Sequence, residues 1–418
     1  MKRKLIKLKA FISKGLGFTY VFLRYKLKSK KNDIDNKQIL FIFGGHLGNA
    51  ILNIDTLLEV GKRFPREQGW TISVLCNNSI KKVLCTIADM SQFDFLDIEF
   101  PYEDGGTVFG TVYRMLNFFN GRKYEKIIVN LAHIMPLATY IVAAVPANDS
   151  IGVFDDLSHE SNENHDIEHN FGNARWYFEK AYKTQIRVEF NTQEIIRQKL
   201  ILNHLGIDYK TRIYPIEKLC EYSIPSEKYF TVAVDSANMV KRWEPQRFAE
   251  VINLIIEKYG LLACITGGGN ASDIFKKMQP FLKYTDKTLN YIGKTNFKEW
   301  VELLRGSSFH FGVDSGSIHI ASSVGTQAFS MIGVWDGTRV LPYIIEDKSQ
   351  FTKEPICIYM NAVMELPCYG CIPKRGLMGS GNLKCIELCR QGKICYCLDN
   401  ISVDDSYRVI NKWMDVNL

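Results

Sequence analysis

Three short segments place polar side chains and glycines directly after apolar runs that are typical of buried strands. The most informative is Asp314-Ser315-Gly316-Ser317-Ile318-His319, which follows the run at 309–313. Glycine lets the backbone come close to an anion, and the N-terminus of the helix expected next offers unpaired N–H groups and a positive dipole end. The segment therefore predicts a phosphate-binding loop that contains Asp314, Ser315 and Gly316.

Two upstream segments have the same character. Ser236 follows the strand-like run at 229–234 and precedes Lys241-Arg242-Trp243, and Pro245 then marks the first turn of a helix. Gly44-Gly45-His46-Leu47-Gly48-Asn49 follows the run at 39–43 and precedes a segment with apolar residues at helical spacing. Each segment predicts a strand, a polar turn and a helix.

Together the three motifs resemble those of glycosyltransferase family 9, whose best-known members are heptosyltransferases of lipopolysaccharide core assembly. The family's hallmarks are a leucine-glycine-aspartate turn, a lysine-x-tryptophan segment and an aspartate-threonine/serine-glycine-x-x-histidine loop. They correspond here to Leu47-Gly48-Asn49, Lys241-Arg242-Trp243 and Asp314-Ser315-Gly316-x-x-His319. Three motifs in this order are far more specific than any one of them. The resemblance spans roughly residues 38–400 and implies the GT-B fold, an α/β architecture of two facing Rossmann-like domains with parallel sheets.

Composition and periodicity point to the same fold class. The chain of 418 residues is 46% hydrophobic, which is enough for two ordinary domains. Strand-like runs at 71–75, 126–130, 261–265 and 328–332 alternate with helical patterns, as in parallel sheets covered by helices on both faces. The predicted organisation is a basic amphipathic tail (1–37), an acceptor domain (38–215), a nucleotide-sugar domain (226–400) with a cysteine-rich segment (368–397), and a C-terminal helix (401–418).

The donor half must neutralise a diphosphate leaving group as the bond between sugar and phosphate breaks. No acidic D-x-D pair stands at the right place to hold a metal ion, so we assign this charge to Lys241, Ser236 and the amides at Ser315-Gly316, without a catalytic metal. Gly268 follows the next strand and allows a nucleoside to approach closely, although it also suits a plain turn. By resemblance, Lys294 and Thr295 line the base pocket and His319 faces the donor. Asp314 shapes its loop or contacts the donor sugar.

The acceptor half departs from the family at the position of the catalytic base. An inverting transfer needs a base for the acceptor hydroxyl, and the family uses the aspartate of its leucine-glycine-aspartate turn. This chain has Asn49 there, and an amide accepts no proton at neutral pH. His46 on the same turn can replace it, or Asp155 or Asp156 from a neighbouring strand end. Asp55 is a further candidate, but it lies six residues on, nearly two helical turns away. Alternatively, the chain has lost catalysis.

Six of the eleven cysteines lie between 368 and 397, in a loop-like region. A cytosolic protein would not keep them as stable disulfides, so four thiolates on one structural metal ion is the favoured interpretation, ahead of free thiols and disulfides. The expected ligands are Cys368, Cys371, Cys385 and Cys397, with Cys389 as a substitute. Related autotransporter heptosyltransferases use such a site for iron, and thiolate softness alone does not separate iron from zinc.

The net charge of +7 belongs to the N-terminus. Residues 1–31 carry eleven Lys or Arg and no Asp or Glu, which leaves −4 for the remaining chain. Apolar residues recur at helical spacing between Leu5 and Leu16, and a basic amphipathic helix is typical of proteins that bind an anionic membrane surface. We expect a peripheral protein on the cytoplasmic face of the membrane. Nucleic acid is not an expected partner, because the rest of the chain is acidic.

These observations favour an inverting glycosyltransferase that moves a heptose or similar sugar from a nucleoside diphosphate, with ADP-heptose the expected donor, onto a lipopolysaccharide-type glycan or glycolipid. Two alternatives stay open. One is a protein heptosyltransferase of the autotransporter type, favoured by the cysteine cluster. The other is a catalytically silent binding scaffold, suggested by Asn49 but opposed by the intact donor motifs.

Overall fold

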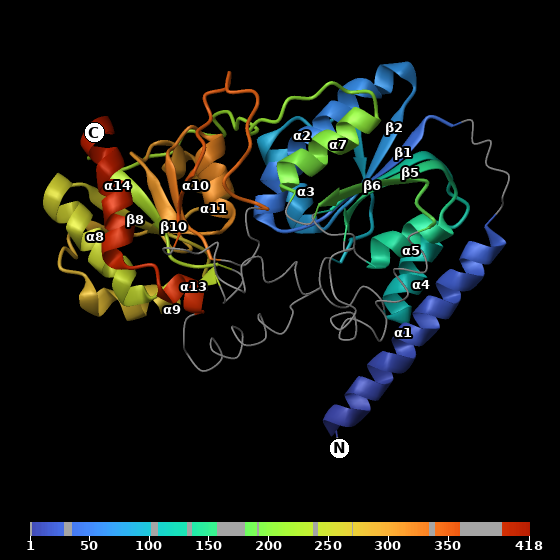
Figure 1. The fold of residues 1–418 in the computed structure, drawn as a ribbon, viewed down its shortest axis with the longest axis horizontal. Coiled ribbons are helices and arrows are strands. Elements are labelled where there is room, and N and C mark those ends of the chain that lie inside the picture. Colours follow the sequence, from blue (N-terminus) through green and yellow to red (C-terminus); the bar gives the residue numbers. More distant parts are fainter. Residues whose placement is uncertain are drawn as a thin grey trace. The chain divides into compact units, whose positions relative to one another are not determined.

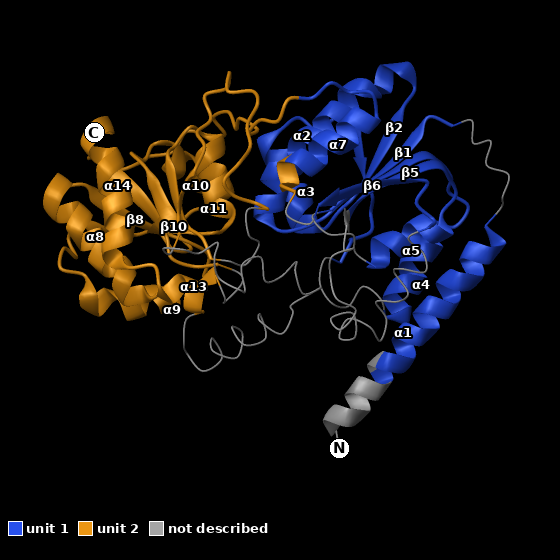
Figure 2. Ribbon diagram, viewed as in Figure 1, with its two compact units in different colours: residues 1–190, 196–209 blue, residues 191–195, 210–418 orange. Residues whose placement is uncertain are grey.

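The computed structural model describes residues 2–28, 36–101, 108–131, 136–156, 180–189, 192–236, 241–269, 271–333, 339–359 and 395–418 (Figure 1). The chain forms two compact units, 1–190 with 196–209 and 191–195 with 210–418 (Figure 2). The sequence places the boundary between 215 and 226. In the structure the short segment 191–195 is already part of the second unit, where buried Glu194 pairs with buried Arg339.

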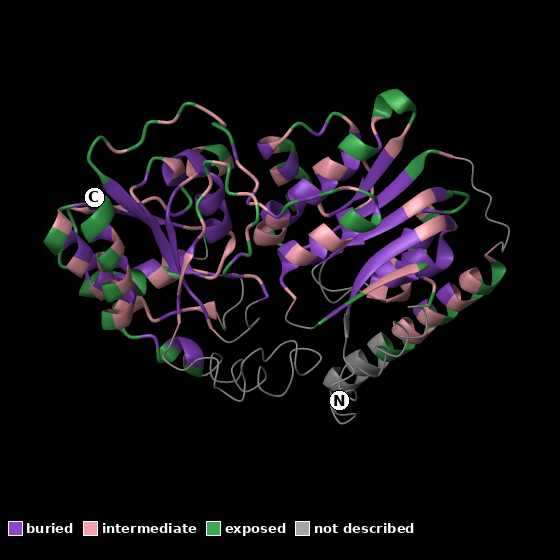
Figure 3. Cartoon of the chain, turned by 45° about the horizontal axis from the view of Figure 1, so that its top comes forward, coloured by how far each residue is buried: buried purple, intermediate pink, exposed green. Residues whose placement is uncertain are grey.

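The first unit is built on a six-stranded sheet. Its strands are β1 (Gln38–Phe43), β2 (Thr71–Leu75), β3 (Phe93–Phe95), β4 (Tyr124–Asn130), β5 (Ala147–Asp156) and β6 (Thr184–Glu189). The spatial order is β3-β2-β1-β4-β5-β6, and all neighbouring pairs are parallel. The central strands are buried (Figure 3), in keeping with their nearly continuous apolar sequence.

The helices of this unit cover both faces of the sheet. They are α1 (Lys2–Leu27), α2 (Leu47–Arg63), α3 (Asn78–Ile87), α4 (Phe109–Phe118), α5 (Pro136–Ala144) and α7 (Glu194–His204). Leu40 and Ile42 of β1 pack in one cluster with apolar residues of α4 and α5. A 3₁₀ turn, Arg66–Gln68, precedes β2.

Helix α1 is docked on the first unit and is not a separate tail. Val21 is fully buried in the same core cluster as α4 and α5. The Tyr20 hydroxyl donates to Asn117 Oδ1 at 3.1 Å, and the Tyr20 ring lies 6.1 Å from that of Phe109 and 5.5 Å from that of Tyr113. The second half of α1 therefore belongs to the folded unit, although the sequence predicts a tail over residues 1–37.

The second unit repeats the architecture. Its strands are β7 (Tyr229–Ala233), β8 (Leu262–Thr266), β9 (Thr288–Asn290), β10 (His310–Val313), β11 (Ala328–Met331) and β12 (Ile356–Ile358). They are arranged in the order β12-β11-β10-β7-β8-β9, again with parallel neighbours throughout.

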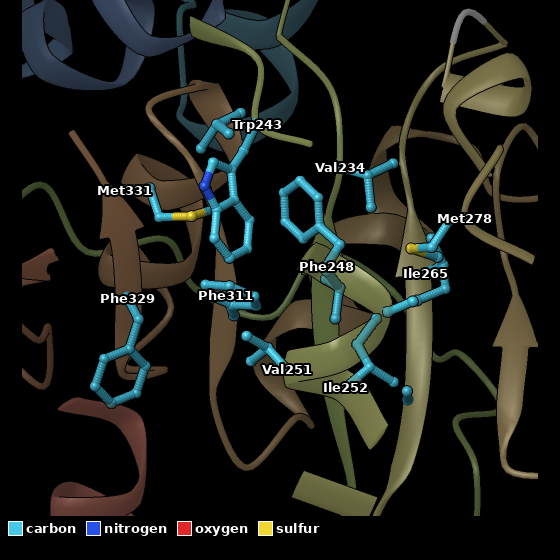
Figure 4. Close-up of a cluster of buried hydrophobic side chains, with 14 of the residues drawn as sticks. Val234, Trp243, Phe248, Val251, Ile252, Ile265, Met278, Phe311, Phe329 and Met331 are labelled. Carbon is cyan, nitrogen blue, oxygen red and sulfur yellow. The ribbon is translucent and has the colours of Figure 1, made fainter. Parts of the chain in front are cut away.

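The helices of the second unit are α8 (Pro245–Tyr259), α9 (Ala271–Met278), α10 (Phe297–Arg305), α11 (Gly316–Ser323), α13 (Tyr396–Asp399) and α14 (Val403–Asn417), with a 3₁₀ turn at Gln279–Phe281. Pro245 opens α8, and Gly260 ends it in the left-handed conformation at φ 70°. Figure 4 shows the core between sheet and helices, where the Trp243 ring meets Phe248 and Phe311 edge to face at 5.1 and 6.3 Å.

The strand order reverses once in each sheet, between β1 and β4 in the first unit and between β7 and β10 in the second. In open parallel sheets, ligands bind outside the carboxyl ends of the strands at such a reversal. His46 and Asn49 follow β1, Ser236 and Lys241 follow β7, and Asp314 follows β10. The predicted chemical groups are therefore at the positions where this topology binds ligands.

Candidate active site

The loop between β10 and α11 has the geometry of an anion-binding site. Strand β10 ends at Val313, and α11 begins three residues later at Gly316. Ser315 is the N-cap residue, yet its side chain makes no capping hydrogen bond. The first amides of α11 and the Ser315 hydroxyl can therefore bind an anion such as phosphate.

An ion pair joins this loop to the segment after β7. Lys241 Nζ lies 2.6 Å from Asp314 Oδ2, and the two side chains are 19% and 13% exposed. Burial by itself would raise the pKa of Asp314, but the Lys241 ammonium outweighs it and holds that pKa below its usual value. The pair is therefore charged at neutral pH, with the lysine beside the helix N-terminus as the motifs predict.

His319 lies on α11 and is almost fully buried. Its Nδ1 makes a short hydrogen bond with the Tyr343 hydroxyl. Burial lowers the pKa of His319 to about 4, against the opposing effect of Asp314. The imidazole is thus neutral at physiological pH and suits hydrogen bonding better than charge neutralisation. Tyr343 was not predicted as part of this group, because no motif marks it.

The start of the β7 loop is held by Asp235. Its Oδ1 accepts from the Ser236 backbone N–H at 2.8 Å and from Arg242 Nε at 2.8 Å. Arg242 therefore stabilises the loop, while its neighbour Lys241 points to Asp314. Trp243 is a packing residue, as expected, and its indole N–H donates to the Ile401 carbonyl at 3.2 Å.

Two further loops at this edge contain the remaining predicted donor residues. The Gly293 amide donates to the Gly267 carbonyl at 3.1 Å, which joins the loops after β8 and β9. Gly267 has φ 154°, and a Cβ there would lie 2.7 Å from that of Ala271, so this position requires glycine. Gly268 and Lys294 are exposed, and Thr295 is half-buried.

In the first unit, Asn49 has a structural task. Its Oδ1 accepts from the His46 backbone N–H at 3.2 Å and so caps the start of α2. A Cβ on Gly45 would lie 2.5 Å from Asn49 Cβ, so glycine is required for this turn, where φ is 128°. The His46 side chain is exposed at the same turn.

The acids that could replace the missing base, Asp55, Asp155 and Asp156, differ in what the structure shows of their side chains. Asp55 is buried and accepts the Tyr209 hydroxyl at 3.0 Å inside the first unit, so it serves the core. Asp155 and Asp156 end β5, but their side chains lie outside the described residues.

The predicted metal ligands are only partly within the described residues. Cys368, Cys371 and Cys385 lie outside them. Cys397 is buried, and its Sγ lies 3.7 Å from Sγ of Cys395, a residue that was not in the predicted set. Two thiolates on one tetrahedral metal ion are about 3.8 Å apart for metal–sulfur bonds of about 2.3 Å. The two sulfurs are therefore close enough to share one metal ion, and equally close enough for a thiol–thiol hydrogen bond.

Within the parts of the chain that the structure describes, no helix is both long enough and apolar enough to span a bilayer. The face of α1 that points away from the unit nevertheless carries Ile12, Leu16, Leu23 and Leu27, each more than half exposed. Lys9 and Lys26 on this helix are exposed as well.

Comparison with known proteins agrees with this geometry. Residues 177–354, less than half of the chain, match the model of the family described as Glycosyltransferase family 9 (heptosyltransferase). The lipopolysaccharide core heptosyltransferase OpsX of Haemophilus influenzae is 26% identical over 119 residues, which are 28% of this chain and 34% of that protein. The chain thus aligns with about a third of that relative's length.

Two solved structures cover nearly the whole chain. The glycosyl transferase family 9 structure from Veillonella parvula has a TM-score of 0.58 at 15% identity, over 93% of this chain and 98% of that one. The E. coli heptosyltransferase WaaC with ADP has a TM-score of 0.53 at 11% identity, over 91% and 100%. The chain has the GT-B fold of these structures. The resemblance to glycosyltransferase family 9 is confirmed over residues 177–354, which include the second and third motifs.

Proposed function

We propose that the protein is an inverting glycosyltransferase that moves a heptose from ADP-heptose onto a lipopolysaccharide-type glycan. The observation that carries the proposal is the Lys241–Asp314 pair beside the N-terminus of α11. A half-buried ammonium next to the first amides of a helix suits the two negative charges of a diphosphate. The family match over 177–354 includes both residues.

In the proposed reaction, the diphosphate occupies the start of α11. As the anomeric bond breaks, charge grows on the leaving phosphate oxygen, and Lys241 with the amides at Ser315 and Gly316 stabilises it. Asp314 keeps the lysine charged and aimed at this position before the donor arrives. These groups supply the positive charge without a catalytic metal.

The acceptor's proton needs a base, and we propose His46. Asn49 accepts a backbone hydrogen bond at the first turn of α2 and has no basic group to offer. His46 stands on the same turn with an exposed side chain, and imidazole is the side chain that most often serves as a general base.

A nucleotide-sugar panel tests the proposal. Purified protein is incubated with ADP-heptose and with other nucleotide sugars, and nucleotide release is measured with and without a truncated lipopolysaccharide acceptor. We expect release from ADP-heptose that the acceptor stimulates, and its loss in Lys241→Ala. Lys276→Ala, at a 72% exposed lysine on α9, is the matched control. Release from none of the donors would refute the proposal, and transfer only to a protein acceptor would favour the autotransporter-type alternative.

We also propose one structural metal ion, iron or zinc, on the cysteine segment, with Cys395 added to Cys368, Cys371, Cys385 and Cys397 as candidate ligands. The residues directly after the segment are tied to the donor motif and to α8, because the Ile401 carbonyl accepts from the Trp243 indole N–H and Asp399 pairs with Arg247. Elemental analysis of protein made without a metal-affinity tag should find about one metal ion per chain. Neither metal, together with fully titratable thiols in the segment, would refute the site. Chelation should lower the unfolding temperature before it affects turnover.

Finally, we propose that the protein works as a peripheral protein on the cytoplasmic face of an anionic membrane. The exposed apolar face of α1 supports this, together with the eleven basic residues among the first 31. Apolar side chains enter the interfacial region, while lysines pair with lipid phosphates.

A further inference from the structure

A chain of hydrogen bonds runs from the interior of the second sheet to the start of α11. Thr231 Oγ1 lies 2.9 Å from His310 Nδ1, and His310 Nε2 lies 2.9 Å from Ser317 Oγ. Ser317 Oγ in turn lies 2.9 Å from Ser315 Oγ. Thr231 and His310 are fully buried and Ser317 is nearly so, whereas Ser315 is half-exposed at the helix N-terminus. This chain of hydrogen bonds thus connects the core to the anion-binding loop.

Neutral imidazole gives this chain a direction. Burial lowers the pKa of His310 to about 3, so one ring nitrogen donates and the other accepts at neutral pH. With the proton on Nε2, His310 donates to Ser317, Ser317 donates to Ser315, and the Ser315 hydrogen is left to donate outward. With the proton on Nδ1, every bond from Ser317 onward reverses, and Ser315 presents only lone pairs.

The inner end of the chain allows both directions. Ser307 Oγ donates to the Leu304 carbonyl at 2.7 Å, so it can only accept from Thr231, which lies 3.3 Å away. The Thr231 hydroxyl can therefore donate to His310 Nδ1 at the shorter distance, or turn to Ser307 while Nδ1–H donates to Thr231. Either tautomer keeps its buried groups bonded, so an outside ligand can decide between them.

We propose that His310 is a positioning residue whose Nε2–H tautomer, acting through Ser317, makes the Ser315 hydroxyl a donor to the diphosphate of the nucleotide sugar. The inference rests on the proposed function for the identity of the ligand. A phosphate oxygen accepts and never donates, so it selects this direction of the chain. The side chain of His310 acts only through the two serines.

Affinity for ADP and for adenosine separates this role from a general effect on the fold. Ser315→Ala should weaken ADP binding roughly tenfold to a hundredfold, the scale of a hydrogen bond to a charged group, and leave adenosine binding unchanged. His310→Leu and Ser317→Ala should each give much of the same loss. His310→Gln should retain affinity, because its amide can still donate toward Ser317. In Ser315→Ala/His310→Leu the loss should equal that of Ser315→Ala alone, and additive losses would overturn the proposal.

Nitrogen-15 spectra of labelled histidine test the tautomer directly. With ADP bound, His310 should carry its proton on Nε2, and a proton on Nδ1 in that complex would overturn the proposal. If wild-type protein bound neither ADP nor inorganic pyrophosphate, the proposed function would fail. The connection is then judged in the free protein: Ser315→Ala should shift the His310 Nε2 signal, and an unchanged signal refutes the relay. If His310→Leu does not fold, Ser317→Ala replaces it in the affinity measurements, because Ser317 lies outside the strand.

Discussion

The loops after β1 and after β10 each border the strand-order reversal of their sheet, but they differ in charge. The β10 loop contains Asp314 in an ion pair with Lys241, at the start of a helix. The β1 loop has no acid, and its side chain at the family's base position, Asn49, accepts a backbone hydrogen bond.

The difference shows which part of the shared architecture depends on charge. In the proposed function a diphosphate requires positive charge beside the β10 loop, and Lys241 from the β7 segment supplies it together with its counter-ion Asp314. A helix start needs only a hydrogen-bond acceptor, and asparagine supplies one as well as aspartate. The first unit can therefore keep its fold without the acid, while the base for the proposed transfer must come from another side chain.

The largest effect is expected at His46. His46→Ala should reduce transfer by roughly two to four powers of ten, the usual contribution of a general base. Donor binding should remain, because the substituted side chain is in the first unit. Transfer rates are measured with ADP-heptose and a truncated lipopolysaccharide acceptor. Near-normal transfer would exclude His46 as the general base and leave Asp155 and Asp156 as the candidates.

Lys241→Ala comes next, with turnover lowered by roughly two to three powers of ten. The substitution removes a charge that stabilises the leaving group and leaves Asp314 without its nearby ammonium. Circular dichroism should show the native fold, and Lys276→Ala should behave as wild type in the same assay. Turnover close to normal in Lys241→Ala would remove this residue from the mechanism.

A smaller effect is expected for the exposed apolar face of α1, which lies in the first unit and is proposed to bind the membrane. Leu16→Ser/Leu23→Ser should weaken binding to vesicles that contain anionic phospholipid by about tenfold or more, since two apolar side chains lose their burial. Phe281→Ser, at a 43% exposed residue of the second unit, is the control. Deleting residues 1–31 is a poorer test, because it uncovers the core around Val21. Unchanged vesicle binding in the double variant would refute the proposed role of this face.

The smallest effect is expected for Asn49→Asp. The carboxylate can accept the same backbone hydrogen bond and gains about 0.3–1 kcal/mol of unfolding free energy from the helix dipole. If His46 is the base, the transfer rate should hardly change. A strong rise in transfer would mean that position 49 still faces the reacting hydroxyl. If the wild-type protein binds the donor but only this variant transfers the sugar, the result would favour the hypothesis of a catalytically silent binding scaffold.

Much of the fold could be predicted from the sequence, because alternating strand and helix patterns in both halves allow few arrangements other than parallel sheets. The donor loop was also predictable, since Lys241, Asp314 and His319 lie in recognisable motifs. His310 was not, because its sequence position is that of an ordinary strand residue, and only the register beside Thr231 reveals its partners. The docking of α1 depends on long-range contacts of Tyr20 and Val21, which helical periodicity does not predict.

Calorimetric titration of ADP into three proteins tests the central claim, that donor binding depends on the charged loop of the second unit and not on the turn after β1. Wild type and Asn49→Asp should bind ADP with the same affinity, and Lys241→Ala should bind it at least tenfold more weakly, since one charged contact to phosphate is lost. Equal affinity in wild type and Lys241→Ala would contradict the account.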